Sequence, residues 1–71
     1  MSEETRIAEF LIRKIEEKGM SVTEFCKATG LSVTFYYNMK ERKSFHSTSV
    51  HKIVVALGIE EEFKEFLENE N

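Results

Sequence analysis

Apolar side chains recur three and four residues apart in several stretches of the chain, which is the spacing of one face of an α-helix. In the first stretch this face carries Ile7, Phe10, Leu11 and Ile15. The pattern ends near Gly19, and Gly30 and Gly58 follow later stretches in the same way. A helix commonly ends on a left-handed residue, usually glycine. The sequence therefore predicts an all-α fold that its three glycines divide into helices.

The two helices after Gly19 have complete start signals. Ser21 can cap a helix that runs from 22 to about 28, with Glu24 as its capping-box partner three residues later. Ser32 can cap the next helix, which follows after a short turn. Two short helices joined by about four residues with a glycine inside have the helix-turn-helix layout, whose second helix can enter a DNA major groove. A corner of this kind also occurs as plain architecture.

Two more helices complete the predicted fold. Ser47 can cap a fourth helix, whose buried stripe consists of Val50, Ile53, Val54 and Leu57. A short fifth helix from Glu60 carries Phe63, Phe66 and Leu67 on one side. We see no linker, repeat or low-complexity tract. A chain of 71 residues supports one thin core, so residues 1–71 are expected to form a single five-helix domain.

The helix that follows Ser32 has two different faces at 100° per residue. One arc is expected to join the core and holds Phe35, Tyr36 and Met39. The other arc holds Val33, Thr34, Tyr37, Asn38 and Glu41. In a helix-turn-helix the N-terminal half of this helix reads the bases, so the candidate base-contacting residues are Val33, Thr34, Tyr37 and Asn38.

The chemistry of this arc suits base edges. The amide of Asn38 can pair with both N6 and N7 of adenine, and Val33 and the methyl of Thr34 can pack on a thymine methyl. Tyr37 is open to two interpretations, because it can touch DNA or pack across a protein interface. A solvated or protein-facing surface is the competing interpretation of the whole arc.

Charge is unevenly distributed along a chain whose formal charge is −3. Residues 20–58 carry five basic and two acidic side chains, whereas both ends are acidic. Phosphate contacts need local positive charge and helix N-termini, so the candidate DNA backbone contacts are Ser21, Lys27, Ser32, Lys40, Arg42 and Lys43. On charge alone, the alternative is a solvated surface with an acidic tail.

Other classes of function find little support. The chain shows no nucleophile and base pair and no phosphate-binding glycine loop, so we expect no enzyme. Two His and one Cys cannot build a four-ligand zinc site, and we expect no cofactor. Cys26 is interpreted as a small core residue in the corner between the two short helices. The longest apolar run, residues 53–57, is too short to cross a membrane, and the protein is expected in the cytoplasm.

A family resemblance rests on the stretch GMSVTEFCKATGLS at 19–32 and on Ala-Leu-Gly-Ile at 56–59. These residues resemble the lambda-repressor-like helix-turn-helix family of Cro/CI or XRE type, over roughly residues 6–67. The resemblance implies a five-helix DNA-binding domain, commonly a dimer on two-fold operators. The chain departs from the family pattern at Val22, where a Gln is common, at Arg42 and Phe45, where a Gly and a Pro often follow the recognition helix, and at Tyr36, where an aliphatic residue is usual.

Two hypotheses of function follow. The first is a transcriptional regulator that binds specific double-stranded DNA and acts as a repressor by occupying an operator. The second is an interaction module that keeps the helix-turn-helix core but binds a protein partner instead of DNA. A homodimer is expected because one small domain makes few DNA contacts. The candidate dimer interface is Phe63, Phe66 and Leu67, unless these side chains only close the monomer core.

Overall fold

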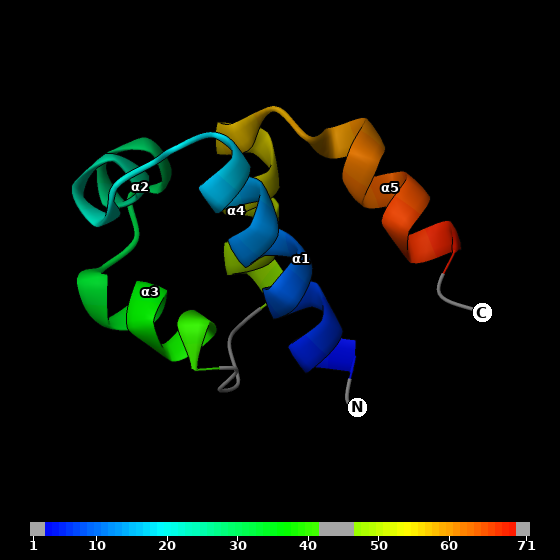
Figure 1. Cartoon of the computed structure of the whole chain (residues 1–71), viewed down its shortest axis with the longest axis horizontal. Coiled ribbons are helices and arrows are strands. Elements are labelled where there is room, and N and C mark those ends of the chain that lie inside the picture. Colours follow the sequence, from blue (N-terminus) through cyan, green and yellow to red (C-terminus); the bar gives the residue numbers. More distant parts are fainter. Residues whose placement is uncertain (1–2, 42–46, 70–71) are drawn as a thin grey trace.

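The computed structural model describes residues 3–41 and 47–69, which form five α-helices (Figure 1). They are α1 (Glu3–Glu17), α2 (Val22–Thr29), α3 (Val33–Lys40), α4 (Ser47–Leu57) and α5 (Glu60–Glu68). The predicted all-α class is confirmed, and the start of α2 lies where its capping signal placed it. Helix α2 extends one residue beyond the predicted end, to Thr29. None of the described helices has the length and apolar character needed to span a bilayer.

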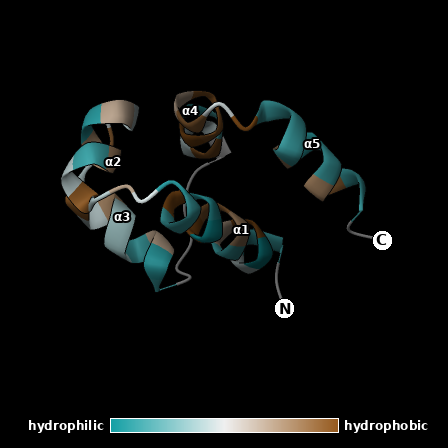
Figure 2. Cartoon of the chain, turned by 45° about the horizontal axis from the view of Figure 1, so that its top comes forward, coloured by the Kyte–Doolittle hydropathy of each residue, from teal (hydrophilic) through white to brown (hydrophobic). Residues whose placement is uncertain are grey.

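Helices α1 and α4 occupy the middle of the molecule (Figure 1). Helices α2 and α3 lie on one side of them, and α5 lies on the other (Figures 1 and 2). Helix α1 packs on α3 and α4, α2 packs on α3 and α4, and α5 packs mainly on α4. The helix-turn-helix pair and α5 therefore stand at opposite ends of the domain.

The core is a single cluster that draws on all the helices except α5. Its buried members are Ala8, Leu11, Ile12, Ile15, Phe25, Tyr36, Met39, Val50, Ile53, Val54, Leu57 and Ile59. The predicted stripe of α4 is confirmed in full, and Figure 2 shows how hydrophobic that helix is compared with α5. In α1 the buried set is shifted, because Ala8 and Ile12 are buried while Ile7 and Phe10 pack only at the edge of the core. Helix α1 contacts both α3 and α4, so its buried face is wider than one stripe.

The three glycines all have positive φ angles, of 66°, 75° and 66° at Gly19, Gly30 and Gly58. L-residues with a side chain rarely adopt this left-handed conformation. The prediction that these glycines end helices is confirmed. Helix α4 begins at Ser47, whose side chain is outside the described part of the structure.

Candidate nucleic-acid interface

The start of α2 is held by a reciprocal capping box. The Ser21 hydroxyl accepts a hydrogen bond from the Glu24 backbone N–H at 3.1 Å, and the Ser21 N–H donates to the Glu24 carboxylate at 3.0 Å. The bond from the Ser21 backbone lowers the pKa of the Glu24 carboxyl below its ordinary value. The predicted cap is confirmed. It also places the Glu24 carboxylate at the N-terminus of α2, where the candidate interface would need to bind a DNA phosphate.

The turn between α2 and α3 is fixed by Thr29 and Gly30. Gly30 takes the left-handed conformation, and its N–H donates to the carbonyl of Cys26 at 2.9 Å. A Cβ on Gly30 would meet no atom within 4 Å, so the requirement for glycine comes from its backbone angle. The buried hydroxyl of Thr29 donates to the carbonyl of Phe25 at 2.8 Å and accepts from the N–H of Leu31 at 3.2 Å. One hydroxyl thus links the last turn of α2 to the turn that follows.

Sequence reasoning assigned no role to Thr29. A signal was available, because a threonine just before a C-terminal glycine can hydrogen bond to the carbonyl four residues earlier. The half-buried Cys26 was interpreted as a core residue of this corner, and it packs against the edge of the core. Among the described residues, no three His, Cys, Asp or Glu side chains meet in a way that could hold a metal ion.

The start of α3 differs in charge from the start of α2. The Ser32 hydroxyl accepts from the backbone N–H of Phe35 at 3.1 Å, which confirms the predicted cap. The first turn of α3 contains no acidic residue, whereas the first turn of α2 contains Glu24. Free N–H groups and the helix dipole attract anions at a helix N-terminus. Of the two caps, Ser32 therefore stands at the N-terminus better suited to a phosphate.

One face of α3 joins the core as predicted. Tyr36 and Met39 are buried, and the ring of Tyr36 meets the ring of Phe25 edge-on at a centroid distance of 5.3 Å. Phe35 was also expected in the core, but it is only half-buried and packs against the core from outside. These contacts fix the rotation of α3 about its axis and therefore decide which residues point outward.

The opposite face of α3 is open. Val33 is 50% exposed and Tyr37 is 48% exposed, and Thr34 and Glu41 are exposed as well. Asn38 is half-buried, so it stands at the margin of this surface. The structure thus brings the four candidate base-contacting residues onto one side of α3, with two large apolar side chains among them. The ring of Tyr37 is braced edge-on by the ring of Tyr36 at 5.4 Å.

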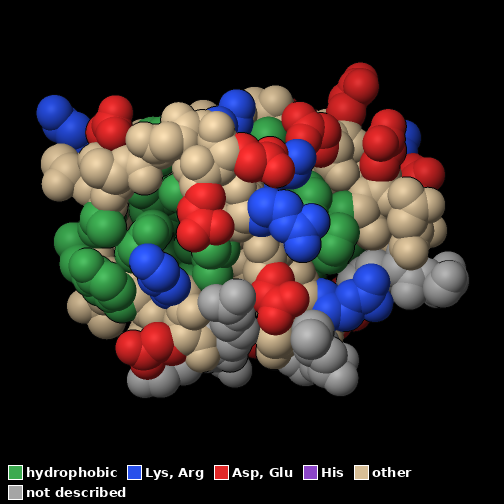
Figure 3. Space-filling view, viewed as in Figure 1, with side chains coloured by type: hydrophobic (Ala, Val, Ile, Leu, Met, Phe, Trp, Pro, Cys, Tyr) green, Lys and Arg blue, Asp and Glu red, His purple; other side chains and the backbone are tan. Residues whose placement is uncertain are grey.

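The candidate backbone contacts are only partly within the described residues. Lys27 and Lys40 are exposed, and the Lys40 ammonium lies 5.8 Å from the centroid of the Tyr36 ring. Arg42 and Lys43 lie outside the part of the chain that the structure describes. Figure 3 shows acidic side chains gathered mostly toward the α5 end of the face it displays. On this face the helix-turn-helix end is thus less acidic than the opposite end.

The three candidate dimer residues do not share one surface. Phe63 and Leu67 line a groove of about 260 Å³ together with Ile7, Val50 and Val54. Phe66 lines a different groove, between α1 and α5, where its ring stacks on Phe10 at 4.5 Å. Leu67 is 37% exposed, whereas Phe63 and Phe66 are half-buried. The sequence pattern placed these residues together because it could not show how α5 lies against α1 and α4.

Comparison with known protein families identifies the fold family of this corner. A family model for the Cro/C1-type HTH DNA-binding domain matches residues 11–68, from the second half of α1 to the end of α5. No curated protein and no solved structure matches the chain. The matched region includes the capped corner and the whole outward face of α3.

Proposed function

Because the chain belongs to the family of Cro/C1-type helix-turn-helix DNA-binding domains, we propose that it regulates transcription by binding a specific double-stranded DNA site through α3. The mode of action proposed is repression by occupancy of an operator. The observation that carries the proposal is the outward face of α3, where Val33 and Tyr37 are about half exposed in a helix whose orientation is fixed by buried Tyr36 and Met39. Large apolar side chains held out on a rigid helix suit contact with thymine methyl groups.

Base readout is assigned to Val33, Thr34, Tyr37 and Asn38. The first three are well exposed and face the major groove in this docking geometry. Asn38 lies at the margin, from which its amide can still reach a base edge. Its bidentate pairing with adenine would contribute roughly 1–3 kcal/mol of discrimination. Asn38→Ala is therefore expected to relax the preference at one adenine position.

Backbone contact is assigned to Ser32, Lys27 and Lys40, together with Arg42 and Lys43. The non-acidic first turn of α3 favours a phosphate at Ser32. Ser21 is the weakest member of the predicted set, because the Glu24 carboxylate already occupies its N–H. Each cation that contacts a phosphate contributes about one unit to the salt dependence of binding.

A homodimer is proposed for recognition of two-fold sites. The groove lined by Phe63 and Leu67 is the more apolar of the two surfaces beside α5, and Leu67 stands exposed at its edge. Pairing through this surface would leave both α3 helices free for adjacent major grooves. Leu67→Glu should then weaken dimerisation in sedimentation experiments while leaving the monomer folded.

The central test measures DNA affinity and its salt dependence. Sites are selected from a random duplex pool with the full chain, and binding is followed by fluorescence anisotropy at several salt concentrations. Lys40→Gln should lower affinity on all sequences and reduce the salt slope by roughly one unit. Lys64→Gln removes the same charge from the exposed surface of α5, and it should change the DNA affinity and the salt slope less than Lys40→Gln does. Absence of any salt-dependent duplex binding would refute the proposal.

The competing function is a protein-interaction module that retains this fold without binding DNA. The formal charge of −3 and the Glu24 carboxylate at the start of α2 favour it. Its protein partner would use the exposed face of α3, so Tyr37→Ala would abolish partner binding. The same selection experiment decides between the two, because an interaction module would enrich no DNA site.

A further inference from the structure

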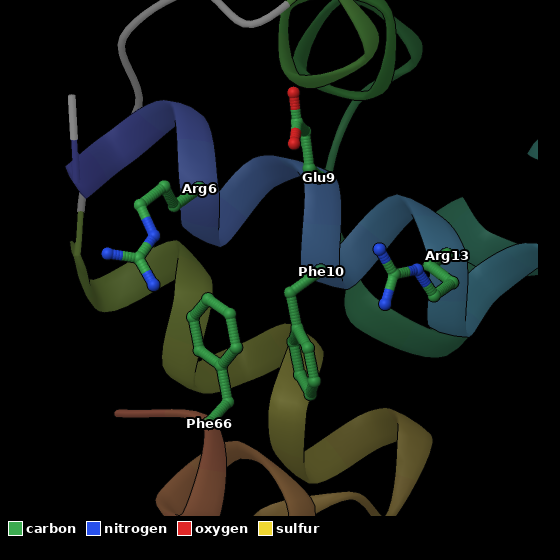
Figure 4. A pocket seen from close by; sticks show the side chains of 5 residues that line it. All are labelled: Arg6, Glu9, Phe10, Arg13 and Phe66. Carbon is green, nitrogen blue, oxygen red and sulfur yellow. The ribbon is translucent and has the colours of Figure 1, made fainter. Parts of the chain in front are cut away.

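A groove between α1 and α5 combines two arginines with two stacked aromatic rings (Figure 4). Its floor consists of the rings of Phe10 and Phe66, whose centroids are 4.5 Å apart at an interplanar angle of 26°. The Arg6 guanidinium lies over the Phe66 ring at 5.9 Å, and Arg13 stands on the other side of the ring pair (Figure 4). The site continues along α5 as an open depression of about 350 Å³.

The spacing on α1 gives the groove a direction. Arg6, Phe10 and Arg13 lie on one face of the helix, with the two arginines seven residues apart. Seven residues correspond to roughly 10.5 Å along a helix axis. Two acidic groups on one partner helix, also seven residues apart, would have the same spacing along its axis. A partner that presents two acidic groups at this interval can pair with both arginines of α1. An apolar side chain between the two acidic groups would then lie on the aromatic floor.

The two walls carry opposite charge. On α1 the charged side chains that line the groove are Arg6, Arg13 and the single carboxylate Glu9, so this wall carries a net positive charge (Figure 4). On α5 the lining includes Glu62 and Glu65, and Glu62 is already paired with Lys14. A carboxylate on the partner is therefore attracted to the α1 wall and repelled from the α5 wall, which fixes the side on which its acidic residues lie.

We propose that this groove docks an acidic amphipathic helix of another protein, with two acidic residues seven apart facing Arg6 and Arg13 and an apolar residue between them facing Phe10 and Phe66. A third helix laid in the groove between two others is a common mode of peptide recognition. Arginine and aromatic side chains are the residue types enriched at the centres of protein interfaces. Guanidinium groups also pair with carboxylates in a bidentate manner.

This site is distinct from the DNA-binding and dimer surfaces. Helices α2 and α3 are at the other end of the domain (Figure 1), and the groove lined by Phe63 and Leu67 has no arginine in its lining. A domain bound to an operator would keep the groove open. The groove would then bring a second protein to the DNA site.

The test begins with selection of a helical partner. A displayed library of single helices, with a fixed apolar stripe and randomised flanking positions, is selected against the full-length chain. We expect enrichment of Asp or Glu at two positions seven residues apart on one flank. The best selected peptide is then synthesised with a fluorescent label and titrated by anisotropy against wild type and variants.

The variants separate the groove from general charge effects. Arg13→Gln should weaken peptide binding at least about tenfold, and Arg6→Gln with Arg13→Gln should weaken it further. The matched control, Lys52→Gln with Lys64→Gln, removes two exposed charges outside the groove and should change peptide affinity less than about threefold. Phe66→Ala should also weaken binding, and thermal unfolding monitored by circular dichroism shows whether each variant folds.

The outcomes are decisive in both directions. Failure to select any helix, lack of acidic enrichment, or equal losses in the groove and control variants would overturn the proposal. DNA affinity measured on the same samples keeps this result separate from the proposed function. If the arginine variants lose the peptide but bind DNA as the charge-matched control does, the groove is an independent docking site.

Discussion

The helix-turn-helix corner and α5 are built in opposite ways. In the corner, Ser21 and Ser32 cap their helices, Thr29 joins the turn to α2, and Phe25 is fully buried beneath α3. Helix α5 has Ile59 at its N-cap position and so lacks a side-chain cap, and none of its nine residues is buried. It is attached by packing on α4, by the Lys14–Glu62 ion pair, and by aromatic contacts of Phe63 and Phe66 with Phe10.

The corner owes its shape to hydrogen bonds between residues close in sequence, whereas α5 owes its position to contacts with distant helices. Hydrogen bonds between residues two to four apart set the geometry of the corner, so the turn that leads into α3 is fixed by its own residues. Isolated helices shorter than about 12–15 residues are marginal in water, so α2 and α3, with eight residues each, and α5, with nine, all depend on their surroundings, but α5 has no side-chain cap and no buried residue. Its contacts with α1 and α4 are only partly buried, so we expect it to open at lower free energy than the corner.

The largest expected difference between the two regions comes from truncating one phenylalanine in each. Phe25→Ala removes a fully buried ring beneath the recognition helix and should lower the free energy of unfolding by about 3–5 kcal/mol. Phe66→Ala removes a half-exposed ring and should cost clearly less, because part of its surface is already in water. Urea denaturation measures the loss of unfolding free energy in each of the two variants. Equal losses would mean that α5 is as integral to the core as the corner is.

A smaller effect is expected at the turn. Thr29→Val keeps the shape of the side chain but leaves the N–H of Leu31 without the buried hydroxyl, at a cost of about 1–3 kcal/mol. Thr23→Val on exposed α2 is the matched control and should change stability little. The two melting temperatures provide the comparison. A loss in Thr23→Val as large as in Thr29→Val would remove the special role of the Thr29 hydroxyl.

The same contrast explains what the sequence could predict. The Ser21 and Ser32 caps, the glycines and the faces of α3 depend on neighbours in the chain, and these features were predicted correctly except that Phe35 and Asn38 are both half-buried. Features that depend on how distant helices pack were missed. Examples are the burial of Ile12, the position of Phe66 away from Leu67, and the groove that Arg6 and Arg13 form with α5. Periodicity tells which side of a helix is apolar, but it does not tell which neighbouring helix covers that side.

A third effect distinguishes stability from DNA binding at the start of α3. Ser32→Ala removes the cap and should cost about 1 kcal/mol of folding stability. Ser32→Asp keeps a capping oxygen and should retain most of that stability, but it adds a negative charge where we propose a phosphate. Thermal melts and DNA anisotropy on both variants give the two readouts. If Ser32→Asp binds DNA as tightly as wild type, no phosphate sits at this helix N-terminus.

The smallest expected effect concerns the ion pair that attaches α5 to α1. The hydrogen bond with Lys14 lowers the pKa of the Glu62 carboxyl, and the same bond raises the pKa of Lys14. A carboxyl whose pKa is lowered by folding stabilises the native state above its ordinary pKa and loses this contribution as pH falls through the lowered value. Amide hydrogen exchange in α5, corrected for its intrinsic pH dependence, should therefore accelerate below about pH 4.5.

Two variants test whether this acid response comes from the ion pair. Glu62→Gln should raise exchange in α5 at neutral pH and flatten the acid response, whereas Glu61→Gln on the same exposed turn should preserve the acid response. Exposed ion pairs contribute little to global stability, so the melting temperature should move by far less than in the variants above. If Glu61→Gln and Glu62→Gln have the same exchange profile, the acid response of α5 comes from its overall charge and not from the contact with Lys14.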